Sequence, residues 1–354
     1  MRQAGVRAAL LVVAAVALAL PPYFAWPAAE PPAAWHPSPL ADVPGPRNEA
    51  LAGAERIPLG GAHGPEDVAF GPDGALYTGV ADGRILRRRP DGSLDTVART
   101  GGRPLGLRFG GDGRLYVADA ARGLLAMGRD GSVEVLVREH GHRPFRLTDD
   151  LDVAADGTVY FTDASTRVGL GDAARDVVEQ YPTGRLFSWQ AGTGVRLLHG
   201  RLAFANGVAL DRDERSVLVA ETARYRVQRC WLRGDRAGRC DVFADNLPGF
   251  PDGVTRGRDG RFWVALVSPR NALLDRVHPH PRLKTALLRL PDALRPGPKA
   301  YGRVLGLGED GRVVHDLHDP SGAAAAFVTN AVEHAGHLYL GGLESGWIAR
   351  VRVP

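Results

Sequence analysis

Short apolar stretches alternate with tight polar turns along most of the chain, and the pattern recurs at intervals of roughly forty residues. Each copy opens with a short apolar strand, passes a turn that is commonly Asp-Gly, and continues into a second apolar strand. In the first copy, residues 65–70 lead to the turn at 72–74, and residues 75–77 follow. A third and often a fourth strand come next. Short strands separated by turn residues predict an all-β fold.

Six copies of this repeat cover the body of the chain. They open at residues 65, 104, 149, 206, 252 and 329. Copies of this length, with about four strands each, are typical of propeller blades. The sixth copy is short of strands, and residues 55–59 are expected to supply its outer strand and close the ring. The pattern therefore predicts one domain, a six-bladed β-propeller over residues 55–354.

A long segment, residues 268–299, interrupts the fifth copy between its second and third strands. Apolar stretches at residues 272–274 and 286–290 predict a partly helical excursion over one face of the propeller. Long ordered loops are more often functional than not. We expect this insertion to shape the mouth of a site.

The first residues differ in character from the rest of the chain. Arg2 and Arg7 precede an uninterrupted apolar stretch, residues 8–20, and the chain stays largely apolar through Trp26. A basic start and a short apolar core are typical of an export signal. Counted through Trp26, however, the apolar segment is nearly long enough to span a bilayer. Residues 1–26 are thus predicted to be a signal peptide or, with slight preference, an uncleaved membrane anchor.

Either interpretation of residues 1–26 places the body of the protein outside the cytoplasm, in the periplasm or at the cell surface, membrane-anchored or secreted. Residues 27–54, rich in Pro and Ala, are expected to act as a tether.

The two cysteines, Cys230 and Cys240, flank a Gly-rich turn. In an oxidising compartment they are predicted to form a cross-strand disulfide; the alternative is two unpaired thiols on an outer strand.

The formal net charge of +4 comes from Arg residues interleaved with Asp and Glu through the whole sequence. The one tight basic run is Arg87, Arg88 and Arg89, on an expected strand beside a turn. Nucleic-acid binding needs basic residues clustered on one face, with aromatic residues for stacking. The sequence therefore predicts no nucleic-acid partner.

Candidate chemistry comes from one repeat position, the residue directly before the first buried pair of each innermost strand. This position should recur at one height around the central channel. Across the six copies it holds Glu66, Leu105, Asp149, Asn206, Asp252 and Thr329. Converging carboxylates repel one another and raise their own pKa values, and a divalent cation removes that conflict. An all-oxygen set favours Ca²⁺, with Mg²⁺ or Mn²⁺ as alternatives.

Taken singly, each of these residues would more commonly cap a turn or pair with Arg. Four polar residues at one repeat position nevertheless predict a metal site. A second acidic set, Asp119, Asp163 and Glu221, closes the second strands. We expect it to be structural, anchoring loops or pairing with nearby Arg such as Arg122, Arg167 or Arg224. Among the histidines, the weak candidates for the site mouth are His140, His142, His278 and His280.

Five short segments carry a resemblance to a known family. They are residues 64–67 (GPED), 159–165 (VYFTDAS), 204–208 (FANGV), 221–226 (ETARYR) and 250–253 (FPDG). With them, residues 55–353 resemble the strictosidine synthase-like branch of six-bladed propellers. That superfamily also includes gluconolactonase, senescence marker protein, paraoxonase and diisopropylfluorophosphatase.

The resemblance implies roles for the residues of the polar ring. In the calcium-dependent lactonases of the superfamily a Glu, two Asn and an Asp hold the ion, which implies Glu66, Asp149, Asn206 and Asp252 as metal ligands. Asp149 stands where the family usually has Asn, and its extra charge affects affinity or metal choice. True strictosidine synthases use a catalytic Glu in the last blade, and Thr329 stands there. Threonine cannot be that acid–base group, which argues against the condensation reaction.

Two functions remain open from the sequence. The first is a metal-dependent hydrolase of small-molecule lactones or esters, in which Asp252, or less favourably Asp149, activates water as the general base. The second is a non-catalytic propeller, held at the membrane by its N-terminal segment, that binds a ligand or protein and contains a structural metal.

Overall fold

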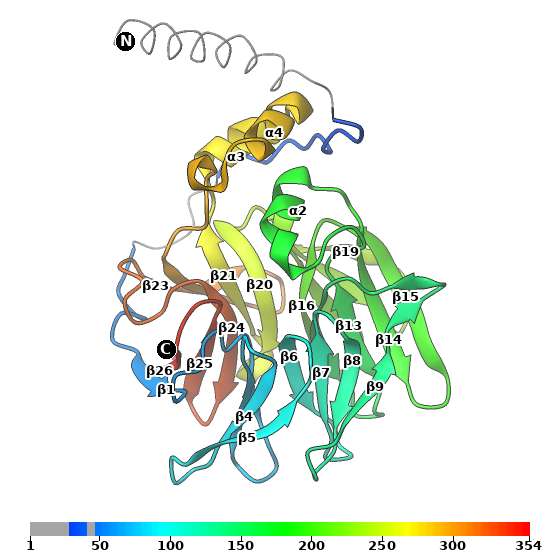
Figure 1. Cartoon of the computed structure of the whole chain (residues 1–354), viewed down its shortest axis with the longest axis vertical. Helices are drawn as coiled ribbons and strands as arrows, with labels where there is room; N and C mark the ends of the chain where they lie inside the picture. The colour runs from blue at the N-terminus through cyan, green and yellow to red at the C-terminus, as the bar shows by residue number, and fades with distance from the viewer. Residues whose placement is uncertain (1–27, 41–46) are drawn as a thin grey trace, which may run out of the picture.

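The computed structural model describes residues 28–40 and 47–354, so the predicted signal or anchor lies outside the described residues. Six four-stranded antiparallel sheets are arranged as blades around a central axis (Figure 1). The prediction of a six-bladed β-propeller is confirmed. The innermost strands, from blade one to blade six, are β2 (Val68–Phe70), β6 (Pro104–Phe109), β12 (Thr148–Val153), β16 (Ala205–Leu210), β20 (Gly249–Arg256) and β24 (Val328–His334).

The other strands follow outward in each blade. The second strands are β3 (Leu76–Gly79), β7 (Leu115–Asp119), β13 (Val159–Asp163), β17 (Ser216–Glu221), β21 (Phe262–Pro269) and β25 (His337–Gly342). The third strands are β4 (Arg84–Arg88), β8 (Gly123–Met127), β14 (Gly184–Gln190), β18 (Arg226–Trp231), β22 (Gly302–Leu307) and β26 (Trp347–Arg352). The outer strands are β5 (Leu94–Arg99), β9 (Val133–Val137), β15 (Gly194–Leu202), β19 (Cys240–Ala244), β23 (Val313–Asp319) and β1 (Glu55–Pro58).

The ring is closed by the start of the domain. β1 pairs antiparallel with β26, with Ile57 opposite Ile348, so the sixth blade receives its outer strand from the N-terminal side. This is the closure that the sequence predicted. It pairs the otherwise open edge of β26, which would be a site for unwanted strand pairing.

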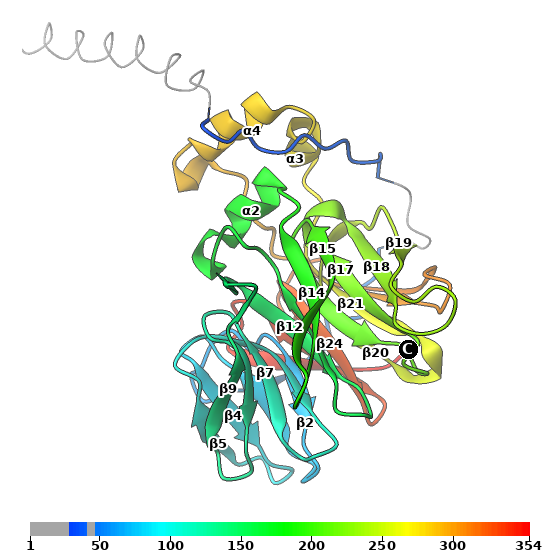
Figure 2. The same cartoon turned by 90° about the vertical axis from the view of Figure 1, so that its right-hand side faces the viewer.

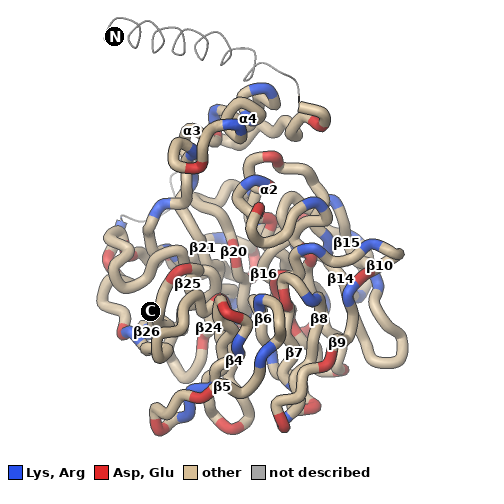
Figure 3. The backbone as a smooth tube through the Cα atoms, in the orientation of Figure 1, with Lys and Arg blue, Asp and Glu red and all other residues tan. Residues whose placement is uncertain are grey.

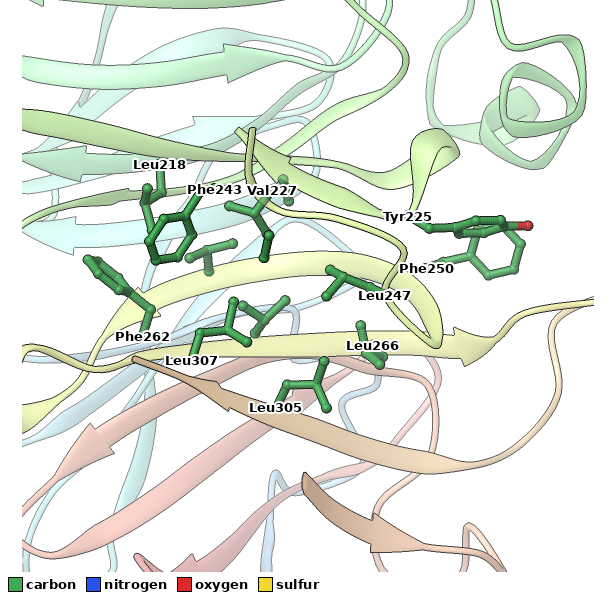
Figure 4. Packing of buried hydrophobic residues seen from close by; sticks show 14 of the residues in the cluster. Leu218, Tyr225, Val227, Phe243, Leu247, Phe250, Phe262, Leu266, Leu305 and Leu307 are labelled. Carbon is green, nitrogen blue, oxygen red and sulfur yellow. The ribbon is translucent and has the colours of Figure 1, made fainter. Parts of the chain in front are cut away.

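Apolar side chains fill the wedges between neighbouring blades. Figure 4 shows the wedge between blades four and five, where Phe243 and Val227 face Phe262 and Leu305. The rings of Phe243 and Phe262 meet edge to face, with centroids 5.7 Å apart. Burial of such side chains contributes about 25 cal/mol per Å² of apolar surface removed from water. This packing fixes the angles at which the inner strands approach the axis.

The predicted disulfide is present: Cys230 on β18 is bonded to Cys240, its direct partner on β19. We expect the double substitution of these cysteines by serine to lower the free energy of unfolding by about 2–3 kcal/mol, because the bond closes a short loop in the unfolded chain. Guanidinium unfolding with and without a reductant measures this. Reductant should have no effect on the double variant, and an unchanged midpoint for the reduced wild-type chain would contradict the expectation.

Helices cover one end of the propeller (Figure 1). The β13–β14 connection carries α2 (Ala173–Glu179), and the β21–β22 connection carries α3 (Ala272–Val277) and α4 (Pro281–Leu288). The same connections carry the 3-10 turns η1 (Leu170–Asp172) and η4 (Asp292–Leu294), and a small hairpin, β10 (Glu139–His140) with β11 (Arg143–Pro144), precedes blade three. Two further 3-10 turns are η2 (Thr222–Arg224) and η3 (Arg258–Gly260). Within the described ranges, no helix is long and apolar enough to cross a membrane.

An extended strap, residues 28–40, lies across these helices (Figure 2). Its Trp35 donates a backbone hydrogen bond to the carbonyl of His278, and the two rings lie 5.4 Å apart between centroids. The buried Lys284 donates from Nζ to the carbonyl oxygen of Ala33 at 2.7 Å. Part of the segment expected to be a tether is therefore docked on the propeller. We call the strap and the insertions that carry α2, α3 and α4 the cap.

Candidate metal centre

The candidate ligands sit at an irregularity shared by five of the six inner strands. In each, the pairing with the second strand slips near its beginning, which marks a β-bulge. The residues within these slips are Leu105–Gly106, Asp149–Asp150, Asn206–Gly207, Asp252–Gly253 and Thr329–Asn330. In blade one the corresponding pair, Glu66–Asp67, directly precedes β2. Bulges re-aim side chains and are common beside active sites.

Three of the four predicted ligands are almost completely buried. Asp149 is 7% exposed, Asn206 is 6% exposed and Asp252 is 8% exposed, while the Glu66 side chain is 12% exposed. The charges of Glu66, Asp149 and Asp252 influence one another, so the structure brings these three carboxyl groups to one place. Acidic positions are visible beside the inner strands β16 and β20 in Figure 3. The structure therefore brings together the residues that share this repeat position, and their role as metal ligands stays a prediction.

The cap covers the end of the propeller at which this site opens. The beginning of β12 lies beside the end of β13, since Thr148 pairs with Asp163, and the beginning of β20 lies beside the end of β21 in the same way. The connections that leave β13 and β21 carry the cap helices. The insertion at residues 268–299 is therefore on the same face as the acidic residues.

Burial and like charges disfavour ionisation of the ring. Burial raises the pKa of Asp149 well above its ordinary value, and the charge of Glu66 adds to the effect. Burial likewise raises the pKa of Asp252, with further increases from Glu66 and Asp149 and a partial decrease from a hydrogen bond with the Asn206 side chain. The pKa of Glu66 is also raised by burial, although Arg103 acts in the opposite direction. Without a cation the ring therefore favours the protonated carboxyl groups, and a bound cation would favour their ionised form.

Arg103 is a member of this site that sequence reasoning missed. Its Nη2 donates to Glu66 Oε2 at 2.9 Å and to the carbonyl oxygen of Gly64 at 2.8 Å. Its Nη1 is buried and has no hydrogen-bond partner within residues 28–40 and 47–354. A buried unsatisfied donor costs about 1–3 kcal/mol. The one available signal was its place two residues before Leu105, the apolar member of the ring.

A second tier directly beyond the ring joins neighbouring blades. Asp67 accepts from the backbone N–H of Leu107 in blade two at 2.9 Å, and also from Asn330 Nδ2 of blade six at 2.7 Å. Asp150 of blade three accepts from the backbone N–H of Val208 in blade four at 2.9 Å. These contacts hold the bulged strands at fixed relative positions and give the acidic second residues a structural role.

Glycine fills the second position of three bulges because neighbouring backbone comes too close for a side chain. A Cβ on Gly207 would lie 2.3 Å from the backbone nitrogen of Val254, and a Cβ on Gly253 would lie 2.6 Å from the backbone oxygen of Thr329. Close backbone approach of this kind is a common reason for glycine in a strand. The Asn-Gly and Asp-Gly pairs at these positions therefore serve ring packing, in addition to presenting Asn206 and Asp252.

The residues present fit a divalent cation. Their donors are carboxylate and amide oxygens, which hard cations prefer. The ionised ring contributes three negative charges, from Glu66, Asp149 and Asp252. Arg103 contributes one positive charge. Two negative charges remain to be balanced in a buried place, where an unpaired charge is costly.

The described residues do not form a closed cage of acidic ligands. In them, the one group of three His, Cys, Asp or Glu ligand atoms within 4.8 Å of one another is His199, Cys230 and Cys240. Its two sulfur atoms form the disulfide, so it is not a metal site. The three ring carboxyl groups stand further apart, with Glu66 held by Arg103.

The second acidic set has the structural role expected of it, with different partners for two members. Asp163 pairs with Arg185 at 2.7 Å and Glu221 pairs with Arg226 at 2.6 Å, each on the adjacent third strand. Arg167 and Arg224, suggested from sequence proximity, lie in the following loops. Cross-strand neighbours meet directly in a sheet, whereas residues next in sequence point elsewhere. Asp119 accepts from the backbone N–H groups of Ala121 and Arg122.

The remaining candidates lie away from the ring. His278 is fully buried in the cap, where burial and the nearby Lys284 charge lower its pKa to about 3. His280 precedes α4, and His140 lies on β10 beside Phe187. His142 occupies an exposed turn. Thr329 is in the ring, but its hydroxyl donates to the carbonyl oxygen of Glu66 at 2.7 Å.

Comparison with known sequences settles the family. The strictosidine synthase-like N-terminal family model matches residues 46–88, and the strictosidine synthase model matches residues 149–235. The adipocyte plasma membrane-associated protein of Salmo salar is 36% identical over 330 residues, or 86% of this chain and 79% of that protein. The chain belongs to the strictosidine synthase-like family. A plant relative, strictosidine synthase-like 10 of Arabidopsis thaliana, is 37% identical over 83% of this chain and 86% of its own length.

Solved structures with lower identity to this strictosidine synthase-like chain share its fold. A gluconolactonase from Xanthomonas campestris superposes with a TM-score of 0.63 and 18% identity, covering 92% of this chain and 95% of its own. Regucalcin, a calcium-binding protein from Agrobacterium tumefaciens, superposes with a TM-score of 0.60 and 13% identity, covering 84% of this chain and 92% of its own. Likeness at these identities establishes the propeller fold alone.

Proposed function

We propose that this chain is a calcium-dependent hydrolase of lactones or esters. The observation that carries the proposal is the ring itself: three buried carboxyl groups and an amide at the beginnings of the inner strands, which when ionised carry more negative charge than Arg103 balances. The fold is shared with a gluconolactonase and with calcium-binding regucalcin, which supports a divalent metal in this position. Strictosidine synthase-like membership is compatible with this chemistry, because Thr329 lacks the acid–base capacity that the namesake reaction needs.

Glu66, Asp149, Asn206 and Asp252 would hold the ion. A divalent cation bound there would supply Lewis-acid polarisation of a substrate carbonyl oxygen. Calcium suits the site better than magnesium, because calcium accepts more oxygen ligands in a flexible arrangement. Asp149, in place of the amide usual in the family, strengthens the negative field at the ion.

Asp252 is the proposed general base. Its carboxylate would accept a proton from the attacking water, and burial, which raises its pKa, makes that carboxylate a stronger base. The hydrogen bond with the Asn206 side chain orients that carboxylate. Asp149 is the alternative base, since it shares the same environment.

Arg103 is the proposed substrate-positioning residue. Its Nη2 donates to Glu66 and Gly64, while the buried Nη1 has a hydrogen-bonding capacity that no described residue uses. We infer that Nη1 donates to an oxygen of the substrate's acyl group and holds it beside Asp252. The cap above would limit the entry of bulk water.

The protein is further proposed to act outside the cytoplasm, anchored by residues 1–26. A disulfide in the outer part of blade four suits an oxidising compartment. Relatives 33–37% identical are named plasma membrane-associated proteins, which supports a membrane location.

A second function is also to be tested, because Asp149, Asn206 and Asp252 are almost completely buried. In this alternative the metal joins the blades as a structural element, and the propeller binds a ligand or protein without catalysis. The ring residues favour this alternative because they come from four different blades, so that an ion bound by them would join those blades.

The deciding experiment measures metal content and hydrolysis on one sample of the full chain in detergent. Metal is removed with a chelator and restored with calcium or magnesium, and a panel of aliphatic lactones and aryl esters is assayed. Bound calcium with calcium-restored turnover supports the hydrolase. Bound calcium without turnover of any substrate supports the structural-metal alternative, and the absence of any bound metal would refute both.

A further inference from the structure

The insertion between β21 and β22 has a charge unlike that of the rest of the chain. Residues 268–299 contain seven basic and two acidic residues, a formal charge of +5, and they hold both lysines of the sequence. The whole chain, with 44 basic and 40 acidic residues, has a formal charge of only +4. The net positive charge of the chain is therefore accounted for by this one insertion. Figure 3 shows Lys and Arg positions on α3 and α4.

Three of these basic residues are exposed and have no acidic partner among the described residues. Two others are neutralised locally: Arg270 pairs with Asp275 at 3.0 Å, and Arg295 pairs with Asp292 at 2.8 Å. The three that have no recorded ion pair and extend into solvent are Arg276, Arg282 and Lys299. Such cations would attract an anionic surface.

Large apolar side chains are exposed on the same part of the molecule. Among the described residues, nine large hydrophobic side chains are exposed, and five of them belong to the cap. These five are Leu40 (54% exposed), Leu170 (39%), Leu273 (50%), Leu283 (51%) and Leu294 (67%). Single exposed leucines are ordinary, but their concentration on a basic surface is a feature of interaction sites.

The cap helices have two distinct faces. Leu274 and Val277 of α3 and Leu287 of α4 are buried against the propeller or one another, whereas Leu273 and Leu283 point outward. The outward positions beside these leucines include Arg276 and Arg282. Outward leucines flanked by arginines are typical of elements that lie in the interface of a membrane.

The path of the chain favours a bilayer as the partner. The strap begins at residue 28 on the cap, so residues 1–27, with their apolar stretch from 8 to 26, connect to the molecule at this end (Figure 2). A membrane that received those residues would meet the cap first.

We propose that the outer surface of the cap rests on an anionic lipid bilayer. Leu273, Leu283 and Leu294 enter the boundary between headgroups and acyl chains, and Arg276, Arg282 and Lys299 contact lipid phosphates. The end of the propeller that contains the ring then faces the membrane, so substrates reach it along the lipid surface. The proposal does not depend on hydrolysis, since a non-catalytic propeller could dock in the same way.

The test compares two single-cysteine variants of the full chain, Leu283→Cys on the cap and Val314→Cys on β23. Val314 is similarly exposed, at 55%, and lies at the opposite end of blade five, because β22 runs away from the cap and β23 follows its far end. The native cysteines form the disulfide and leave no other thiol. Each variant is labelled with an environment-sensitive dye and reconstituted into phosphatidylcholine vesicles with or without phosphatidylglycerol.

We expect the dye at position 283 to be quenched by doxyl-labelled lipid and protected several-fold from iodide in anionic vesicles, while the dye at 314 shows the reverse. Adding Arg276→Glu, Arg282→Glu and Lys299→Glu to Leu283→Cys should remove most of that protection, as should high salt, which screens exposed charges. Equal iodide access at both positions in anionic vesicles would overturn the proposal. Protection in detergent that grows with protein concentration would also overturn it, because it would identify a second copy as the partner.

Discussion

Replacing Asp252 by asparagine is expected to reduce hydrolysis by roughly 10²–10⁴-fold, the usual contribution of a positioned general base. Asparagine keeps the size of the side chain and removes its capacity to accept a proton. It also removes one negative charge from the ring, so calcium binding should weaken in the same variant. Initial rates at saturating calcium, together with calcium titration by calorimetry, separate the two effects.

The fold of this variant should survive. Burial already disfavours the ionised form of Asp252, so a neutral side chain of equal shape does not remove a stabilising charge. Asp176→Asn is the matched control: Asp176 is 1% exposed, burial raises its pKa to about 7, and it lies in α2 outside the ring. That control should retain full activity. Full activity in Asp252→Asn would exclude this residue as the base and point to Asp149.

Much of the architecture was accessible from the sequence because local patterns determine it. Alternating apolar residues and Asp-Gly turns define the strands, and the missing strand of blade six predicted the closure by β1. The facing cysteines were predictable because a turn placed them on adjacent strands. The polar ring was predictable because blades repeat, so that one repeat position lies at one height around the axis.

What escaped prediction depends on contacts between distant parts of the chain. Arg103 enters the ring because blade two places it beside Glu66, thirty-seven residues earlier in the sequence. The docking of Trp35 requires a surface made jointly by several insertions, which no local pattern reveals. The bulges at the ring depend on the close approach of neighbouring inner strands. The repeat position identified the ring residues. It did not reveal Arg103 as their partner or the cap at that end of the propeller.

Calcium is expected to stabilise the protein more strongly as the pH rises. The metal-free folded state raises the pKa values of Glu66, Asp149 and Asp252 above their ordinary values. Between the ordinary and the raised values, the folded chain therefore binds more protons at these groups than the unfolded chain does. The contribution of the ring to stability is greatest at low pH and falls as the pH rises through this window. Calcium reverses the loss, because it requires the ionised carboxylates and binds only the folded ring.

Thermal unfolding from about pH 5 to about pH 7, with calcium and with a chelator, measures this linkage. Burial raises the pKa of Asp150 to about 7 in the adjacent tier, which extends the window to neutral pH. Calcium at about one hundred times its Kd would add about 2.7 kcal/mol, a rise in Tm of roughly 5 °C. Because other titrating groups affect both samples, the difference between the two Tm values isolates the ring. In Asp252→Asn the calcium-dependent difference should shrink at every pH. A calcium effect independent of pH would mean that the ion binds outside the ring, at groups that are already ionised across this pH range.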